Sequence, residues 1–230
     1  MLLIGERYRK RLEAGLRSHT AEPVIWLPDN TAVDPRLAGH ADLGVFIPDD
    51  KHVFIAEEYE PLLVNLLTNR GFEVIPISGQ AARYPADAGL CVCRTGKTTI
   101  YNSKTVSECL KPYLNGVLID VPQGYTKCSV CVVTVSAIIT ADEVIAERCS
   151  SANMDVLRLS PGHITLEGYD YGFIGGAAFL LDDRTLAFTG TLDEHPDRDR
   201  ILDFLQRHGV SAVFLTESPI FDIGGAVRLP

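Results

Sequence analysis

The apolar positions of the chain recur in short runs that follow one repeated order. An apolar strand is followed by a tight turn, a second strand, an amphipathic helix and a third strand. The first complete copy predicts strands over residues 43–47, 52–55 and 72–77, with a helix from about Glu57 to Asn69. Within that helix the leucines fall at helical spacing, at Leu62, Leu63, Leu66 and Leu67. This stretch therefore predicts a ββαβ unit.

Three further copies of the unit follow along the chain. Two of their helices begin at the pattern of a capping box, at residues 105–108 and 140–143, and the last runs from about Pro196 to His208. The predicted strands of these copies are residues 89–93, 98–100 and 117–121, then 130–135, 137–139 and 155–159, and then a run opening at 174–177, 186–188 and 211–215.

The fifth copy is split between the two ends of the chain. Residues 222–229 predict its first strand, 1–4 its second and 24–27 its third, with a helix from Glu6 to Arg17. Ends that complete one unit favour a closed ring over a capped solenoid. The expected fold is α/β: a five-bladed, pseudo-fivefold ββαβ propeller over residues 1–230 as a single domain, its last blade closed by both termini. An α/β sandwich whose units merely look alike is the alternative.

Composition narrows the possible partners and locations. Of 230 residues, 46% are hydrophobic, and 30 Asp and Glu against 21 Lys and Arg give a formal net charge of −9. This balance excludes a disordered chain and offers no basic surface for nucleic acid, but it suits a small cationic ligand. The longest apolar stretch, residues 130–139, is half the length of a membrane span. With no visible export signal and six cysteines, we expect a cytoplasmic protein with reduced thiols and no membrane partner.

Side chains that can ionise or act as nucleophiles lie at the start of the first strand in several of the predicted units. In a ring, the residues that open each first strand face the central channel. These openings carry one imidazole, one thiol and three carboxylates: His40, Asp42, Asp87, Cys128 and Asp222. Groups that are distant in sequence but gather on one end of a rigid scaffold are typical of catalytic sites.

Four of the cysteines also invite a zinc interpretation. On strands, Cys91 and Cys93 would share one face, whereas Cys128 and Cys131 would point to opposite faces. That arrangement suits a tetrahedral site poorly. The sequence therefore predicts no metal site.

Three short motifs in this order resemble the pentein family of guanidino-modifying enzymes, which includes arginine deiminases, dimethylarginine dimethylaminohydrolases, amidinotransferases and agmatine deiminases. His40-Ala41-Asp42 matches the His-x-Asp element of that family, Cys128 falls two units later, and Ile174-Gly175-Gly176 one unit after that. The cyclic order agrees although the linear order is permuted. One departure is Ala177, which stands where a carboxylate would follow Gly-Gly; Glu167 and Asp170, on the preceding loop, are candidate replacements.

The resemblance implies a role for each of these residues. Cys128 would be the nucleophile that forms a covalent amidino intermediate, and His40 would protonate the leaving amine and activate the acceptor. Asp42 and Asp87, with Glu167 and Asp222 as further candidates, would bind the cation. The implied ligand is a small guanidino metabolite, and no cofactor is expected.

A plainer interpretation exists for each candidate residue. Cys128 could be a small buried residue, His40 could bond a loop carbonyl, and Asp42 and Asp87 could form turns at strand entry. The segment Tyr169-Asp170-Tyr171 could line the channel or act as a lid, but packing within its loop is the expected role. Two functions therefore remain: a hydrolase or amidinotransferase, or a catalytically silent binding or sensor protein of the same fold. The sequence specifies neither the substrate nor the oligomeric state.

Overall fold

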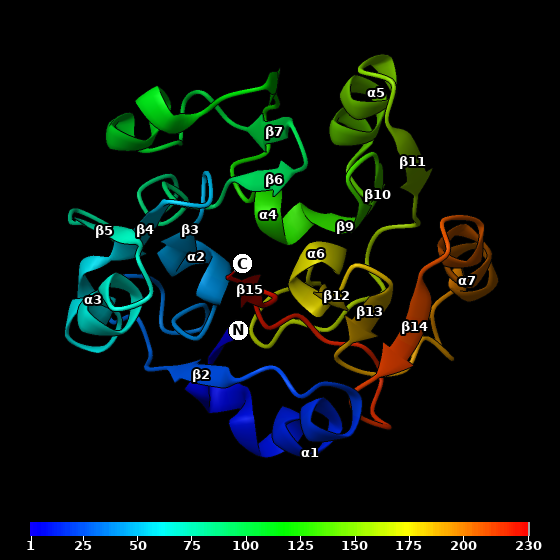
Figure 1. Cartoon of the computed structure of the whole chain (residues 1–230). Helices are drawn as coiled ribbons and strands as arrows, with labels where there is room; N and C mark the ends of the chain where they lie inside the picture. Colours follow the sequence, from blue (N-terminus) through cyan, green and yellow to red (C-terminus); the bar gives the residue numbers. More distant parts are fainter. Residues whose placement is uncertain (230) are drawn as a thin grey trace.

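Five small sheets of three strands make up the framework of the protein. The computed structural model describes residues 1–229, and in each sheet the middle strand pairs antiparallel with one neighbour and parallel with the other. Figure 1 shows the sheets and their helices arranged about a common centre. The sheets are β15 (Val227–Arg228), β1 (Leu2–Gly5) and β2 (Val24–Leu27); β3 (Val45–Phe46), β4 (His52–Ala56) and β5 (Glu73–Ile77); β6 (Cys93–Thr95), β7 (Thr98–Tyr101) and β8 (Val117–Asp120); β9 (Val130–Thr134), β10 (Ala137–Thr140) and β11 (Asp155–Arg158); and β12 (Ala178–Asp182), β13 (Thr185–Phe188) and β14 (Ser211–Phe214).

The two ends of the chain lie in the same sheet, as the split apolar pattern predicted. Strand β15 pairs antiparallel with β1, with Leu2 opposite Arg228 and Leu3 opposite Val227. The amide of Leu229 also donates to the carbonyl of Met1 at 2.9 Å. The hydrophobic side chains of Leu2 and Leu3 are fully buried by this pairing and by the neighbouring sheets.

Helices on the outside of the molecule connect the middle strand to the third strand in four of the units (Figure 1). Each packs an apolar face inward; Leu12 and Leu16 do so in the first. Two of them begin with a 3₁₀ turn, η1 (Glu6–Tyr8) and η2 (Glu57–Tyr59). The four are α1 (Arg9–His19), α3 (Glu60–Thr68), α5 (Glu143–Ser151) and α7 (Arg198–Arg207).

The capping boxes predicted from sequence are both wrong in detail. The segment after residues 105–108 forms only a 3₁₀ helix, η3 (Glu108–Tyr113), because Pro112 cannot donate within a regular α-helix. Helix α5 is capped by Asp142, whose carboxylate accepts from the amide of Ile145 at 2.9 Å, and not by Thr140. The hydroxyl of Thr140 instead donates to the carbonyl of Ser129.

Of the strands at the inner edges of the sheets, β3 and β12 begin later than predicted because the chain makes a helical turn before it extends. One-turn helices precede three of these strands: α2 (Ala41–Gly44), α4 (Thr126–Ser129) and α6 (Ile174–Ala177). An inner edge strand has a partner on only one side, so its first residues need not be extended. The three turns lie near the centre of the molecule (Figure 1).

The five inner edge strands β3, β6, β9, β12 and β15 all contribute residues to the lining of one cavity of about 220 Å³. Buried apolar clusters fill the spaces between neighbouring sheets and under the outer helices. Within residues 1–229, no helix combines the length and hydropathy that crossing a bilayer requires.

Candidate active site

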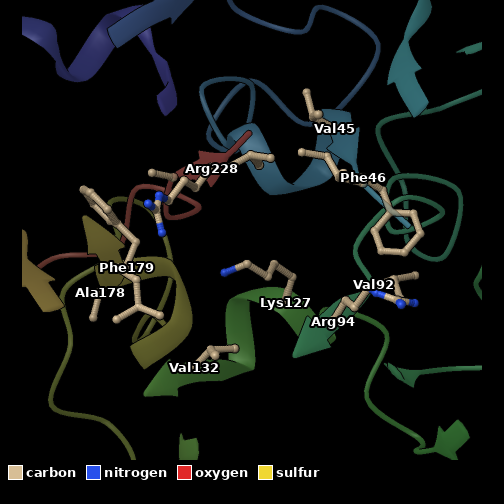
Figure 2. Close-up of a pocket in the computed structure, with 13 residues that line it drawn as sticks. Val45, Phe46, Val92, Arg94, Lys127, Val132, Ala178, Phe179 and Arg228 are labelled. Atoms are coloured by element: carbon tan, nitrogen blue, oxygen red, sulfur yellow. The ribbon is translucent and has the colours of Figure 1, made fainter. Parts of the chain in front are cut away.

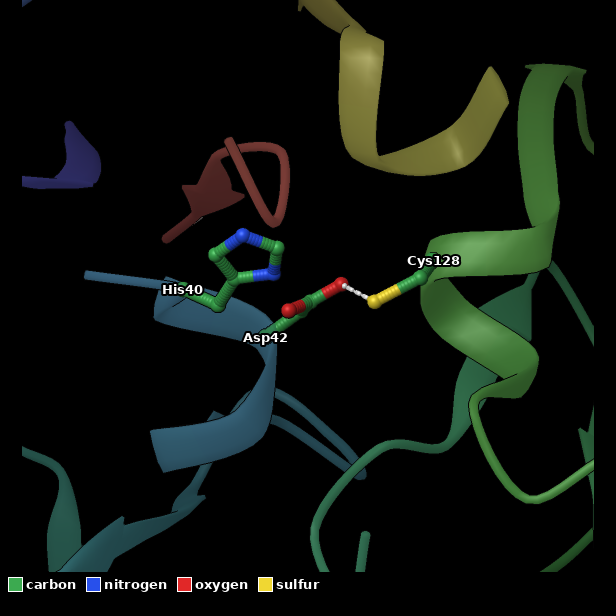
Figure 3. A group of neighbouring side chains, drawn as sticks. All are labelled: His40, Asp42 and Cys128. Atoms are coloured by element: carbon green, nitrogen blue, oxygen red, sulfur yellow. Dashed lines mark hydrogen bonds between the residues drawn. The ribbon is translucent and has the colours of Figure 1, made fainter. Parts of the chain in front are cut away.

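His40, Asp42 and Cys128 meet in the interior of the protein (Figure 3). All three are buried, and one ligand-type atom from each lies within 4.8 Å of the others. The thiol of Cys128 donates to Oδ2 of Asp42 with a distance of 2.7 Å between Sγ and the oxygen. The turns α2 and α4 thus bring together a thiol, an imidazole and a carboxylate that the sequence places in two separate units.

Close backbone contacts fix these turns. The carbonyl of Gly224 accepts from the amide of Asp42, and a Cβ at Gly224 would lie 2.4 Å from the Cβ of His40. Gly224 also has a φ of +70°, so glycine is required here for both conformation and space. On the other side, the hydroxyl of Thr126 donates to the carbonyl of Cys91 at 2.7 Å and anchors α4.

A cavity of about 250 Å³ opens beside the three residues. Of the predicted site residues, His40, Cys128 and Asp222 line it. Most of the remaining wall is aromatic or aliphatic, with one further carboxylate, and consists of Leu37, Leu43, Tyr125, Leu166, Tyr169, Asp170, Tyr171 and Phe173. An apolar, aromatic pocket with a few convergent polar groups is the usual form of a small-molecule site.

Asp222 occupies the space beside the Gly-Gly pair. Its carboxylate accepts from the amides of Phe173 and Gly224, each at 2.8 Å, so it is fixed in position. A Cβ added to Gly176 would lie 1.9 Å from Oδ1 of Asp222. Ala177 is fully buried. The acidic group next to Gly-Gly therefore comes from the fifth unit and not from the residue that follows the glycines.

The remaining predicted acids lie at different distances from the cavity. Asp87 is behind its wall, where it accepts a hydrogen bond from the hydroxyl of Tyr125 at 2.6 Å. Glu167 is exposed and is not among the lining residues, so the structure does not bring it to the site. Asp170, the other candidate replacement for the missing carboxylate, does line the cavity.

Burial favours the uncharged forms of the three groups. It lowers the pKa of His40 and raises the pKa of Asp42 to about 7. The pKa of the Cys128 thiol is raised well above its usual value, first by its contact with the thiol of Cys91 and then by burial. Burial therefore opposes an ion pair between an imidazolium at His40 and a thiolate at Cys128 in the free protein.

Packing within their loop was the expected role of Tyr169 and Tyr171, with lining the channel as the alternative, and the structure shows that both line the cavity. Their loop is held by Arg36, whose guanidinium lies 4.4 Å from the ring centroid of Tyr169 and donates to the carbonyl of Gly168 at 2.9 Å. The available signal was a Tyr-Asp-Tyr segment between glycines, directly before the Gly-Gly turn.

His40, Asp42 and Cys128 are also, within residues 1–229, the only group of side chains close enough to share a metal ion. Imidazole, thiolate and carboxylate are a donor set that Zn²⁺ accepts. The raised pKa values of Cys128 and Asp42 oppose this use, because both groups would have to lose protons to bind the ion. The four cysteines weighed for zinc from sequence do not form such a group.

The chain has the pentein fold. Among solved structures, it is similar to a mutant dimethylarginine dimethylaminohydrolase from Pseudomonas aeruginosa in complex with citrulline, at 10% identity and a TM-score of 0.59, covering 94% of this chain and 91% of that one. It is also similar to an amidinotransferase of the saxitoxin pathway from Microseira wollei, at 9% identity, a TM-score of 0.62 and coverage of 97% and 80%. It is similar, too, to an inosamine-phosphate amidinotransferase from Streptomyces griseus, at 12% identity and a TM-score of 0.58, covering 97% of this chain and 80% of that one.

At the level of sequence, the chain belongs to a family of unknown function, DUF6873, whose model matches residues 3–227. No curated protein matches the sequence significantly.

Proposed function

We propose that the protein is an enzyme that cleaves or transfers the amidino group of a small guanidino compound through a covalent intermediate on Cys128. The observation that carries this proposal is the meeting of His40, Asp42 and Cys128 beside a cavity with aromatic walls. The solved relatives include two amidinotransferases and a dimethylarginine dimethylaminohydrolase, and the last is a complex with citrulline.

Buried polar atoms without hydrogen-bond partners lie at and near the site. Within residues 1–229, six buried side-chain nitrogen or oxygen atoms have no hydrogen-bond partner, and four of them belong to His40, Asp42 and Asp87. Buried polar atoms normally have partners, so the imidazole of His40, which lines the cavity, is available to a ligand. Asp42 and Asp87 do not line the cavity and would act on the ligand from behind its wall. A guanidinium carries five N–H donors and no acceptor. Asp222 and Asp170 supply negative charge at the wall, and the tyrosine rings offer faces on which the planar cation stacks.

The bound cation would also activate the nucleophile. A positive charge within a few ångströms favours thiolate over thiol, which opposes the burial that raises the pKa of Cys128. Neutral His40 takes the thiol proton, and Sγ of Cys128 forms a bond to the guanidinium carbon. When the C–N bond to the leaving amine breaks, the imidazolium of His40 returns that proton to the amine nitrogen.

The second half of the reaction restores the enzyme. Water in a hydrolase, or an amine in a transferase, loses a proton to His40 as it bonds to the amidino carbon. The C–S bond then breaks, and the thiolate of Cys128 recovers the proton from His40. Asp42 holds the thiol in place through its 2.7 Å hydrogen bond in the resting state.

We further propose that residues 1–230 form one domain, a closed five-bladed propeller. The terminal strands share a sheet, and residues from all five inner edge strands line a common cavity, which supports this arrangement. We propose the cytoplasm as its location, because a reducing compartment keeps a nucleophilic thiol available.

A catalytically silent binding protein of the same fold is the second candidate. The raised pKa of Cys128 favours it. Such a protein would use the same cavity to hold a small cation, with Cys128 as a structural thiol.

A cysteine-directed amidine label separates the two functions. The protein is incubated with 2-chloroacetamidine or with 2-chloroacetamide, its neutral counterpart of similar shape, and the adducts are located by mass spectrometry. An enzyme predicts faster labelling of Cys128 by the amidine, protection by guanidino compounds, and loss of both in Cys128→Ser. Equal, slow labelling by both reagents, with guanidino compounds binding but unchanged, would identify the silent protein.

A further inference from the structure

A second cavity, of about 220 Å³, shares no lining residue with the one beside Cys128. It is the cavity surrounded by the five inner edge strands (Figure 2). Three cationic side chains, Arg94, Lys127 and Arg228, line it, and no carboxylate does. All the charged residues that line this cavity are therefore positive, although the chain as a whole has a formal net charge of −9.

Lys127 is the central group of this cavity. It directly precedes Cys128 on α4 but extends into the second cavity, as Figure 2 shows. Within residues 1–229, its amine makes no ion pair and no hydrogen bond. Burial acts to lower the pKa of Lys127, but the neighbouring side chains of Cys93, Asp42, Cys131 and Cys128 outweigh it and raise the pKa, which favours the protonated amine. An ammonium without a counter-ion in a partly enclosed site is costly unless an anion joins it.

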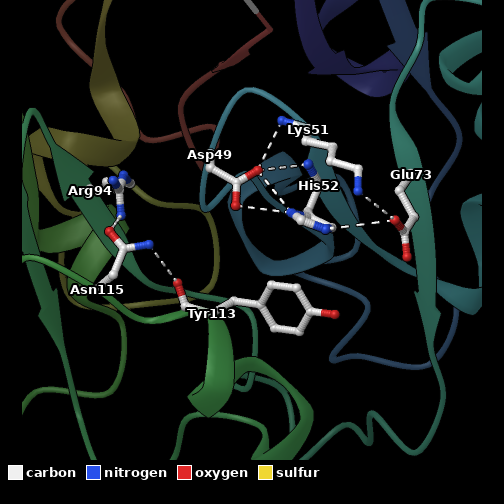
Figure 4. Close-up of polar contacts among 7 residues, drawn as sticks. All are labelled: Asp49, Lys51, His52, Glu73, Arg94, Tyr113 and Asn115. Atoms are coloured by element: carbon white, nitrogen blue, oxygen red, sulfur yellow. Dashed lines mark hydrogen bonds and ion pairs between the residues drawn. The ribbon is translucent and has the colours of Figure 1, made fainter.

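The two arginines leave most of their donors free. Arg94 donates to the side chain of Asn115 at 2.8 Å, and Asn115 in turn donates to the carbonyl of Tyr113, which orients the guanidinium at the rim (Figure 4). Arg228 contacts Asp183 at 3.3 Å. Asp183 is 97% exposed, and such a surface pair contributes little. Both guanidinium groups therefore remain available to a ligand.

We propose that this cavity binds a small organic anion. Its carboxylate or phosphate group lies between Lys127 and Arg228, and Arg94 contributes from the rim. The apolar part of the ligand contacts the side chains that form the rest of the wall, among them Phe46, Val132 and Phe179. The proposal does not depend on the chemistry of Cys128, because the two cavities have separate linings.

Titration calorimetry with benzoate, phenylphosphate and the neutral benzyl alcohol tests this assignment. Benzoate and phenylphosphate distinguish a carboxylate from a phosphate preference, and benzyl alcohol measures what the apolar wall binds alone. We expect at least one anion to bind, to weaken as salt increases, and to lose about tenfold or more affinity in Lys127→Met. Lys104→Met, at an exposed site, is the matched control and keeps the affinity of the unmodified protein.

Two further variants make the test decisive. Arg228→Gln changes a partly exposed side chain and should also lower the affinity for the anion, so the assignment can be tested even if Lys127→Met fails to fold. Cys128→Ser retains anion binding whether or not the proposed thiol chemistry is correct. Absence of binding by both anions, equal binding of benzyl alcohol, or unchanged affinity in folded Lys127→Met and Arg228→Gln overturns the proposal.

Discussion

Cys128 donates its thiol hydrogen to Asp42 across a gap of 86 positions in the chain, with 2.7 Å between Sγ and Oδ2. The contact forms because two one-turn helices, α2 and α4, point their side chains to the same place. Burial raises the pKa of Asp42 to about 7, so this carboxyl changes its charge near neutral pH beside the proposed nucleophile. The stability of the fold and the reactivity of the thiol are therefore both expected to depend on pH.

Asp42→Asn should flatten the pH dependence of stability. In the unfolded chain this carboxyl ionises near pH 4, whereas in the fold it does so near pH 7. Between these values the folded state holds one more proton, so the free energy of unfolding falls by about 1.4 kcal/mol per pH unit as pH rises, and the effect is complete above pH 7. The asparagine variant lacks this contribution and should be the more stable protein at pH 8, by up to roughly 4 kcal/mol.

Urea unfolding at pH 5, 6, 7 and 8 measures this difference. Asp199→Asn, which removes a carboxyl that is 87% exposed, should follow the pH dependence of the unmodified protein. A slope for Asp42→Asn as steep as that of the unmodified protein would show that Asp42 ionises normally in the fold.

Cys91→Ala should make Cys128 ionise at lower pH. The two sulfur atoms are 3.9 Å apart, and this contact is the largest cause of the raised pKa of Cys128. Iodoacetamide reacts with the thiolate, so the midpoint of its rate against pH reports the thiol pKa. We expect that midpoint to move to lower pH in Cys91→Ala and to stay in place in Cys93→Ala. A rate increase that is equal at every pH would indicate easier access to the thiol and not a lower pKa.

Gly176→Ala should damage both the fold and the site. The new methyl group would lie 1.9 Å from Oδ1 of Asp222, whose carboxylate is held by two backbone amides. Overpacking of this kind costs about 1–3 kcal/mol, and the displaced carboxylate should bind a guanidino ligand more weakly. Thermal unfolding and calorimetry with arginine and agmatine measure the two effects. At Gly89 an added Cβ has its nearest neighbour at 3.5 Å, so Gly89→Ala should leave both nearly unchanged.

The repeated architecture could be predicted because each unit carries its own apolar runs. The strands around Val53, Ile138 and Leu186 lie in continuous apolar segments, and the two ends of the chain complement each other in the same way. The helical turns before the inner strands could not be predicted, because α2, α4 and α6 contain four residues each and show no helical period. The effect of Pro112 was also not predicted: the segment expected to form an α-helix after the pattern at residues 105–108 forms only the 3₁₀ helix η3.

The positions of His40, Asp42 and Cys128 at the starts of their units were enough to predict that the three residues lie close together. They did not predict which loops close over the three residues. Tyr169 reaches the cavity because Arg36, from a distant loop, stacks on its ring, and a contact of that kind depends on the tertiary fold. The raised pKa of Cys128 could not be predicted either, because it depends on the neighbouring thiol of Cys91 and on burial.

Circular permutation tests whether the two ends of the chain close a ring. The amino group of Met1 lies 3.4 Å from the carbonyl oxygen of Leu229, and β15 and β1 are antiparallel neighbours, so a linker of about two to four residues can join them as a hairpin. New ends at Gly162, in an exposed loop where an added Cβ meets nothing within 4 Å, interrupt no strand. We expect this permutant to fold with a urea midpoint near that of the unmodified protein. A matched permutant opened at Phe54, which is fully buried in β4, should not fold, because it breaks the middle strand of a sheet. If the Gly162 permutant also failed to fold, the pairing of the terminal strands would not suffice to close the structure, and the proposed five-bladed ring would lose its main support.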